Sequence, residues 1–383
     1  MKLVYLDYAA TTPVAAEVAA TMAQHLTLEG NFANPASRSH RFGWQAEEAV
    51  ESARITVAKL IGASNREIVW TSGATESNNL AIKGVLEGFE SGHVITSSIE
   101  HKATLDTCAY MQESSAKHGG FDVTYLAPNA EGLITAAQVK EALRPDTRLV
   151  SLMLVNNEIG NITDIKSISQ ALSGHAALLH CDAAQGTGKL AIDVAELGVD
   201  LMSICAHKMY GPKGIGALYV RRAPEVKVYQ QIHGGGHERG MRSGTLATHQ
   251  IVGFAKAAEL VIANLEAEIE HNAKLRDKLW AGLELLGDVQ RNSHLSQCSP
   301  NHLNVSFSGV DGEILLASLA QLAVSSGSAC NSASVAPSFV LKALGLADEL
   351  AHAGIRFSVG RYTTEADIDF ALTEIERVLT ALR

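Results

Sequence analysis

Short apolar runs rich in β-branched residues alternate with longer stretches of Ala, Leu and Glu between about residues 45 and 265. The short runs predict strands and the longer stretches predict helices. Because helical stretches separate most of the strands, the pattern indicates an α/β fold with a mainly parallel, seven-stranded sheet covered by helices on both faces. Such sheets bind ligands at the carboxyl ends of their strands. The expected strands are residues 68–71, 93–97, 123–126, 149–155, 176–181, 201–205 and 215–220.

Apolar residues recur at helical spacing from residue 251 to 286, which predicts one long amphipathic helix. Strands and helices are mixed after it, which predicts a smaller α+β domain. We therefore expect a large domain over residues 15–265 and a small domain formed by residues 1–14 and 266–383. The expected elements of the small domain include a strand at 303–307 and helices at 313–322 and 365–382.

Composition narrows the class of protein. The chain has 383 residues, 46% of them hydrophobic and 19% charged, which is typical of globular proteins. Its net charge of −10 argues against direct binding to nucleic acid, because affinity for phosphate backbones comes from clustered positive charge. The five cysteines include no CxxC pair, and neither a signal peptide nor an apolar run of ~18 residues is apparent. We expect a cytoplasmic protein with no membrane contact.

Two polar residues follow neighbouring expected strands. Lys208 comes after strand 201–205 and before a glycine-rich turn, where a lysine can form a Schiff base with a carbonyl cofactor. Asp182 follows strand 176–181 and could pair with the ring nitrogen of pyridoxal phosphate, while Gln185 could hydrogen-bond the ring oxygen. The alternatives are a surface lysine and a helix N-cap.

Two further strand ends carry candidate groups. Ala74 and Thr75 lie where strand 68–71 runs through a small-residue turn into a helix, a place suited to a phosphate or to an ordinary capping box. His101 follows strand 93–97. It could stack on a planar cofactor and transfer protons, or be a hydrogen-bonded histidine at the sheet edge.

The remaining candidates lie farther along the chain. Asn157 and Arg356 could bind a substrate carboxylate, whereas the alternative for the arginine is an ordinary ion pair. Cys330 lies in a Ser, Gly and Ala-rich segment that predicts a mobile loop over about residues 323–335. A free thiol there could take up a group and carry it away, or be a tolerated surface cysteine.

The pair of histidines at 233 and 237 is separated by three glycines, which do not form the rigid helix that such metal-binding pairs need. We expect no resident metal. Arg242 to Thr245 reads as a loop entering a helix, a second place suited to an anion.

Together these segments resemble the cysteine desulfurases, pyridoxal-phosphate (PLP) enzymes of the class V aminotransferase group within fold type I. The matching runs span nearly the whole chain in order. They are residues 5–13, 34–40, 71–76, 100–102, 155–160, 182–185, 207–208, 233–246, 325–334 and 355–364. The sequence Ser325-Ser-Gly-Ser-Ala-Cys330 is similar to the long-loop branch that serves iron–sulfur cluster assembly.

The resemblance implies a role for each matching residue. Lys208 would bind the cofactor covalently and Cys330 would carry the persulfide, while His101 would stack on the ring and act as acid and base. Asn157 and Arg356 would contact the substrate. The resemblance further implies a homodimer in which Thr245 reaches the phosphate of the neighbouring subunit. The other implied cofactor contacts are Ala74, Thr75, Asn157, Asp182, Gln185, Cys205 and His207.

The implied reaction removes sulfur from L-cysteine, giving L-alanine and a Cys330 persulfide for an iron–sulfur scaffold protein or other acceptors. Cys330 could also act as a transient shared ligand of a 2Fe–2S cluster. A selenocysteine lyase or an aminotransferase on the same fold is the alternative, and the presence of Lys208 and Cys330 argues against a non-catalytic adaptor.

The chain departs from the family pattern at three places. Cys205 stands where many relatives have serine, and a thiol is the poorer hydrogen-bond donor. Ala33 replaces a usual glycine, which could restrict that loop. Cluster-assembly members usually continue past the position of Arg383 with an extension that helps to dock the scaffold protein.

Overall fold

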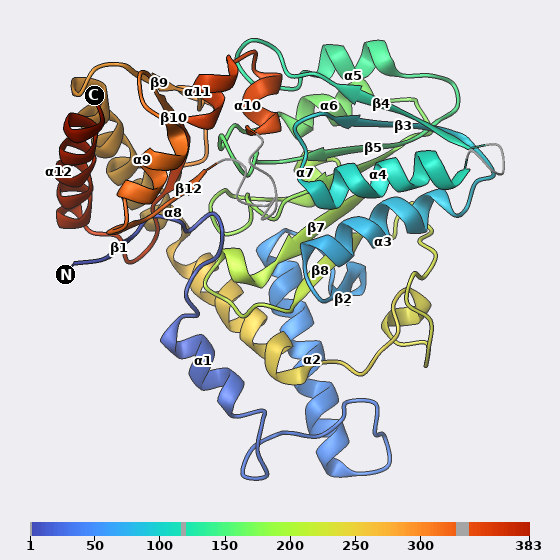
Figure 1. Ribbon diagram of the computed structural model, residues 1–383. Helices are drawn as coiled ribbons and strands as arrows, with labels where there is room; N and C mark the ends of the chain where they lie inside the picture. Colours follow the sequence, from blue (N-terminus) through green and yellow to red (C-terminus); the bar gives the residue numbers. More distant parts are fainter. Residues whose placement is uncertain (1, 116–119, 327–336) are drawn as a thin grey trace.

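The computed structural model describes residues 2–115, 120–326 and 337–383. A seven-stranded sheet forms its centre (Figure 1), and all seven strands expected from the sequence are confirmed, with ends that shift by a few residues. Six strands run parallel to one another, and β8 runs antiparallel to both of its neighbours. The strand order is β2 (Ile68–Thr71), β8 (Gly216–Val220), β7 (Leu201–Cys205), β6 (Leu178–Asp182), β5 (Thr147–Met153), β3 (Gly92–Ser97) and β4 (Phe121–Leu126).

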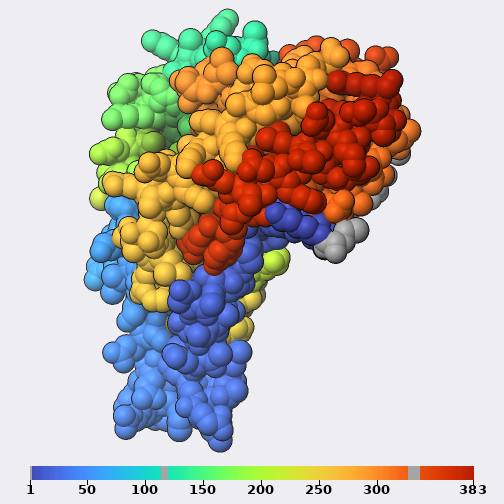
Figure 2. All heavy atoms as spheres, turned by 90° about the vertical axis from the view of Figure 1, so that its left-hand side faces the viewer, coloured from blue at the N-terminus to red at the C-terminus, as the bar shows by residue number. Residues whose placement is uncertain are grey.

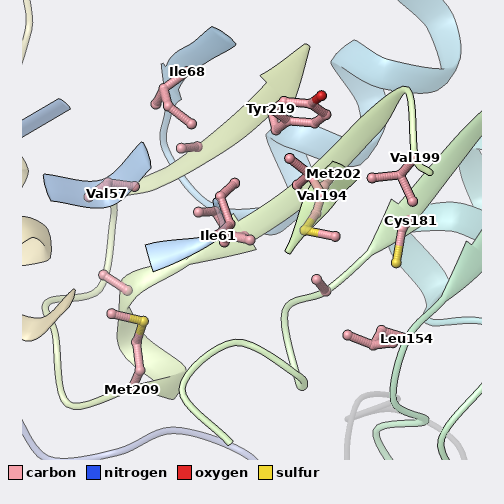
Figure 3. Close-up of a cluster of buried hydrophobic side chains, with 14 of the residues drawn as sticks. Val57, Ile61, Ile68, Leu154, Cys181, Val194, Val199, Met202, Met209 and Tyr219 are labelled. Carbon is pink, nitrogen blue, oxygen red and sulfur yellow. The ribbon is translucent and has the colours of Figure 1, made fainter. Parts of the chain in front are cut away.

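Helices cover both faces of this sheet, as the near-continuous apolar strands require. On one face α3 (Ala74–Leu86) and α4 (Lys102–Ser115) bury residues such as Leu80 and Cys108. The other face carries the largest apolar cluster, part of which Figure 3 shows around Ile61 and Met202. The helices of that face are α2 (Arg41–Leu60), α5 (Ala136–Ala142), α6 (Ile165–Ala171), α7 (Val194–Leu197) and the first half of α8 (Thr248–Leu285).

The 38-residue helix α8 confirms the long amphipathic helix expected from the sequence and leads from the central sheet into a smaller body (Figures 1 and 2). The domain division that we propose at residues 265 and 266 falls within this helix. The smaller body contains the sheet order β12 (Ser325–Ser326), β13 (Gly354–Ser358), β10 (His302–Phe307) and β9 (Val289–Arg291). Its helices are α9 (Gly312–Ser318), α10 (Phe339–Ala343), α11 (Asp348–His352) and α12 (Glu365–Leu382).

Both ends of the chain build the core of this smaller body. The N-terminal strand β1 (Val4–Tyr5) pairs with β11 (Leu322–Ala323), and Val4 and Leu6 are buried with residues of α8, β10, β13 and α12. The helix expected over 313–322 is therefore too long, because α9 ends at Ser318 and Leu322 pairs with β1 instead. Helix α1 (Ala16–Ala23) follows β1 in the chain and packs along α8. None of the described helices combines the length and apolar character of a membrane span.

The parallel strands end at one edge of the central sheet, and this edge positions the site. The antiparallel strand β8 begins there, where Gly216 pairs with both Thr71 and Cys205. A Cβ atom on Gly216 would lie 2.7 Å from the Cα of Gly73, so the turn between β2 and α3 packs directly on the β8 backbone. The ends of β2 and β7 are thereby held close together.

Candidate active site

A cavity of about 620 Å³ opens at the carboxyl edge of the sheet. Nine residues expected at the site from the sequence line it together. They are Ala74, Thr75, His101, Asn157, Asp182, Gln185, Cys205, His207 and Lys208. The structure therefore brings together residues that lie up to 134 positions apart in the chain.

Two of the expected residues that the structure describes do not line the cavity, and a third lies outside the described residues. Thr245 is exposed on the loop before α8. Arg356 is buried in β13 and is not among the residues that line the cavity. Cys330 lies outside the described residues.

Lys208 ends a 3₁₀ turn (Ala206–Lys208) that follows β7 directly. Its Nζ donates hydrogen bonds to the carbonyl oxygens of Ala9 and Ala10, the latter at 2.8 Å. The side chain of Gln185 donates to the same Ala9 carbonyl at 2.8 Å. The N-terminal segment therefore ties the lysine amine to the loop that follows β6.

Asp182 is the last residue of β6, and its carboxylate is fixed on both oxygens. Oδ2 accepts a hydrogen bond from Asn78 of α3 at 2.7 Å, and Oδ1 accepts one from the backbone N–H of Ala184 at 2.9 Å. No helix begins at this point, since the described chain continues as a turn until α7. The alternative of a helix N-cap is thus not what the structure shows, and Asp182 presents a held carboxylate at the cavity.

Cavity residues at the start of α3 form a corner suited to an anion. The residue before the helix is Gly73, which has no side chain to cap the first-turn N–H groups of Ala74 and Thr75. Among the N–H groups around this helix start, the carboxylate of Glu76 accepts a hydrogen bond only from that of Ser72, at 2.8 Å. Glu76 also forms an ion pair with Arg242 at 2.9 Å. A helix N-terminus left uncapped in this way favours a phosphate.

Two side chains close this corner from β7 and the turn after it. Burial, reinforced by the charges of Lys208 and other lysines, lowers the pKa of His207 to about 4, so the imidazole is neutral near pH 7. Burial raises the pKa of Cys205 to about 11, so it is present as a thiol. Both are therefore neutral groups that could hydrogen-bond an anion.

His101 lies at the start of α4, where its Nδ1 accepts a hydrogen bond from the Ala103 N–H at 3.1 Å. Burial lowers the pKa of His101, which the Asp182 charge partly opposes and the Lys208 charge reinforces. With Nδ1 occupied as an acceptor, a neutral ring carries its proton on Nε2. The group is thus able to give or take a proton near neutral pH.

Glu100 holds the loop that carries His101. Its Oε1 accepts hydrogen bonds from the Ser97 hydroxyl at 2.8 Å and the Met153 N–H at 3.1 Å, which joins the ends of β3 and β5. Burial raises the pKa of Glu100 to about 8.

Arg356 forms an ion pair inside the protein. One nitrogen donates to Asp7 at 2.8 Å and another donates to the backbone carbonyl of Asn157 at 2.7 Å. Its buried Nε has no partner among the described residues. A substrate carboxylate at Arg356 would therefore have to share the guanidinium with Asp7.

Asp7, Asn78 and Glu100 were not expected at the site from the sequence. Asn78 did leave a signal, since it is a polar residue one turn before the buried Ala81 and Ile82 on the apolar face of α3. A buried polar residue at such a position usually binds another polar group.

The histidines at 233 and 237 belong to no metal-binding cluster within the described part of the chain. Instead His237 accepts a hydrogen bond from the Gly244 N–H at 3.2 Å, and the adjacent Glu238 is paired with Arg54. This segment is the loop that runs from β8 to α8.

The profile of the family described as Aminotransferase class-V matches residues 4–370. The chain belongs to this family. Within it, the cysteine desulfurase IscS of Acinetobacter baumannii (strain AYE) is 59% identical over 383 residues, covering 99% of this chain and 93% of the relative. This member of the class V aminotransferases is thus a close relative of proteins named cysteine desulfurase, as the sequence motifs indicated.

Solved structures of the family share the architecture over the full length. A structure described as a NifS-like protein has a TM-score of 0.91 and 37% identity, covering 100% of both chains. One described as SspA in complex with cysteine has a TM-score of 0.83 and 42% identity, covering 95% of this chain and 100% of the other. The expected fold type I class is confirmed.

Proposed function

We propose that this chain is a PLP-dependent cysteine desulfurase that converts L-cysteine to L-alanine and collects the sulfur as a persulfide on Cys330. The observation that carries this proposal is one cavity lined by Lys208 and Asp182 in a chain 59% identical to a cysteine desulfurase. The presence of cysteine in a related solved structure favours cysteine as substrate over selenocysteine or an amino donor for transamination.

The residues present fit PLP. Asp182, fixed by two donors, would hold the protonated ring nitrogen, and the uncapped start of α3 with Cys205 and His207 would hold the phosphate. The buried Oε1 of Gln185 and Oδ1 of Asn157 lack partners in the described part of the chain. Unpaired buried oxygens are costly, so these two atoms indicate a polar ligand in the cavity.

When bound, PLP supplies an electron sink for negative charge at the substrate α-carbon. Lys208 would remove the α-proton, because its amine is the basic group that enters the cavity from the end of β7. Neutral His101 would exchange a proton with the substrate sulfur. Asn157 and Arg356 would orient the substrate carboxylate, and the buried Nε–H of Arg356 has no partner among the described residues.

Sulfur transfer requires a thiolate acceptor. The four described cysteines are buried, and burial raises the pKa of each thiol, to about 12 for Cys108 and about 11 for Cys205. They are held as weakly nucleophilic thiols, which supports assigning the acceptor role to Cys330. The Cys330 thiolate would attack the substrate sulfur, so that an S–S bond forms while the bond between that sulfur and the β-carbon breaks. The electron pair of the broken bond would stay with the carbon, which takes up a proton to become the methyl group of alanine.

By the same resemblance we propose a cytoplasmic homodimer in which Thr245 contacts the phosphate in the neighbouring subunit. The exposed position of Thr245 outside its own cavity supports this role. We further propose that the persulfide passes to an iron–sulfur scaffold protein and other acceptor proteins, with Cys330 able to share a 2Fe–2S cluster transiently.

The test is brief exposure of the PLP-loaded protein to L-cysteine, with measurement of alanine and mass spectrometry of the protein. We expect an added sulfur atom on Cys330, no persulfide in Cys330→Ala, and no turnover in Lys208→Ala. Cys298→Ala, which alters another cysteine, is the matched control and should keep both products. Full alanine and persulfide yields from Cys330→Ala would refute the proposal.

A further inference from the structure

Lys189 is a buried lysine beside the candidate active site, with 6% of its surface exposed. It lies on the loop that follows Asp182 and β6. Its Nζ donates a hydrogen bond at 3.0 Å to the backbone carbonyl of Lys208, on the turn that follows β7. Lys189 forms no ion pair with a carboxylate of the described residues.

A buried lysine without an ion pair lowers the stability of the fold. Its presence therefore indicates a role other than stabilising the fold. Burying an ammonium group without a paired carboxylate is costly, and an apolar side chain of similar length would fill the same space at no such cost. Burial, followed by the charge of Lys208, lowers the pKa of Lys189 to about 7, while Cys205 and Glu268 oppose the shift. The charge of Lys189 also disfavours protonation of the buried His302. In either protonation state the nitrogen can donate to the Lys208 carbonyl.

The backbone beside Lys189 is fitted to the same turn. Gly188 has a φ of +78°, and a Cβ atom there would lie 2.7 Å from the Cβ of Met209 and 3.3 Å from a methyl group of Val261. Met209 belongs to the buried cluster of Figure 3. Consecutive residues of one loop, Gly188 and Lys189, therefore contact consecutive residues of the other, Met209 and Lys208.

Local hydrogen bonds fix the loop that presents this pair of contacts. The Lys189 N–H donates to the Gly186 carbonyl at 3.0 Å, and the Thr187 hydroxyl donates to the Ala183 carbonyl at 2.8 Å. These hydrogen bonds hold the backbone between Asp182 and Lys189 in a fixed turn. A displacement of the Lys208 turn relative to Asp182 would break the hydrogen bond from Lys189.

We propose that Lys189 is a positioning residue for the reaction, which fixes the Lys208 turn through its carbonyl and so sets the place of the Lys208 amine relative to Asp182. The inference rests on the proposed function. Catalytic rates fall steeply when a reacting group is displaced even slightly, so loss of this hydrogen bond should lower kcat far more than it raises KM.

The first test compares Lys189→Met, Lys189→Arg and the control Lys140→Met, which alters an exposed lysine on α5. In Lys189→Met we expect a fall in kcat of about tenfold or more with KM for L-cysteine within about threefold. Lys189→Arg, which keeps a donor, should recover part of the rate, and Lys140→Met should match wild type.

A second readout does not depend on turnover. The N–H groups of Met209 and Gly211 both donate to the Ala206 carbonyl at 3.0 Å, so their hydrogen exchange reports on the turn. Lys189→Met should accelerate this exchange about tenfold, while Lys140→Met should leave it unchanged. Wild-type kcat together with wild-type exchange in Lys189→Met would overturn the proposal.

If Lys189→Met does not fold, Gly188→Ala provides the same test through the contact with Met209. Its control is Gly174→Ala, which has a similar φ of +80° but no atom within 4 Å of the new Cβ. A tenfold fall in kcat in Gly188→Ala alone supports the proposal, and equal rates in the two variants contradict it. Failure of the proposed function is distinguishable, because wild type itself would then form no alanine from cysteine.

Discussion

The side-chain amide of Asn78 lies 2.7 Å from Oδ2 of Asp182, and both residues are buried. Asn78 also donates to the Thr104 hydroxyl at 3.2 Å, so one amide on α3 ties the end of β6 to α4. The bond fixes the orientation of the carboxylate that we propose as the partner of the PLP ring nitrogen.

Asn78→Ala should therefore weaken PLP binding. Hydrogen bonds to charged groups contribute about 1.5–3 kcal/mol, so the dissociation constant should rise about tenfold or more. Titration of the apoprotein with PLP, followed by absorbance, measures this. Asn264→Ala on α8, where the amide donates to the Leu260 carbonyl one turn earlier in the same helix, is the control and should bind as wild type does. An unchanged constant in Asn78→Ala would show that Asp182 needs no support from α3.

Cys205→Ser should strengthen cofactor binding. The buried thiol of Cys205 lines the cavity with the start of α3, where we propose that the phosphate binds, and a thiol is a weaker donor than a hydroxyl. A neutral hydrogen bond contributes about 0.5–1.5 kcal/mol, so affinity for PLP should rise a few-fold. Pyridoxal, which lacks the phosphate, is the control ligand and should show no gain. Equal gains for both ligands would place Cys205 away from the phosphate.

Glu100→Gln should change how stability depends on pH. The pKa of Glu100 rises from an ordinary value of 4.5 to about 8 in the folded protein, so the folded state holds a proton that the unfolded state has lost between these values. Glu100 therefore lowers stability as pH rises through this window. Glu100→Gln removes this loss, and its free energy of unfolding relative to wild type should increase between pH 5 and pH 8 by a few kcal/mol.

Chemical denaturation at the two pH values measures this change. Ser97→Ala removes a hydrogen bond that lowers the pKa of Glu100 but keeps the carboxyl, so stability should still fall as pH rises, at least as steeply as in wild type. Parallel pH profiles for Glu100→Gln and wild type would contradict a buried carboxyl with a raised pKa.

Arg54→Met should strongly destabilise the fold. Arg54 of α2 pairs with Glu238 at 2.7 Å, with both side chains 3% exposed, and Glu238 also accepts from the Trp70 N–H at 2.8 Å. Removing one partner of a buried ion pair costs about 3–5 kcal/mol, because the other charge stays buried. Arg38→Met disrupts the exposed pair with Glu47 and should cost less than about 1 kcal/mol.

The free energy of unfolding in denaturant checks both values. In the double variant with Glu238→Gln, the cost should be smaller than the sum of the two single costs. Additive costs would mean that the two side chains do not act on each other.

The strands could be predicted from the sequence because their signal is local. The run Leu201–Cys205 is apolar at every position except Ser203 and is buried throughout, which is the pattern of a strand covered on both faces. The reversed direction of β8 and the early end of α9 could not be predicted. Both depend on pairing partners far away in the chain, as when Val4 pairs with Leu322.

The same distinction holds for the site. Lys208, Asp182 and His101 lie at or just after the carboxyl ends of strands. Because ligands bind at these strand ends in α/β sheets, the sequence predicted that the three side chains would lie close together. Lys189 and Glu100 could not be identified, because their importance depends on burial and on one contact each with a distant backbone group. The ion pair that occupies Arg356 likewise depends on Asp7, whose partner lies 349 residues away.

The pairing of β1 with β11 has a consequence for synthesis of the chain on the ribosome. Val4 and Leu6 are translated well before the apolar residues that cover them, which lie between Leu275 and Leu379. The central sheet can assemble while translation continues, since domains generally fold as units in the order of synthesis. Strand β1 must wait, unprotected, until those covering residues have been translated. A nascent chain stalled before β10 would therefore expose its N-terminal apolar residues to chaperones and proteases.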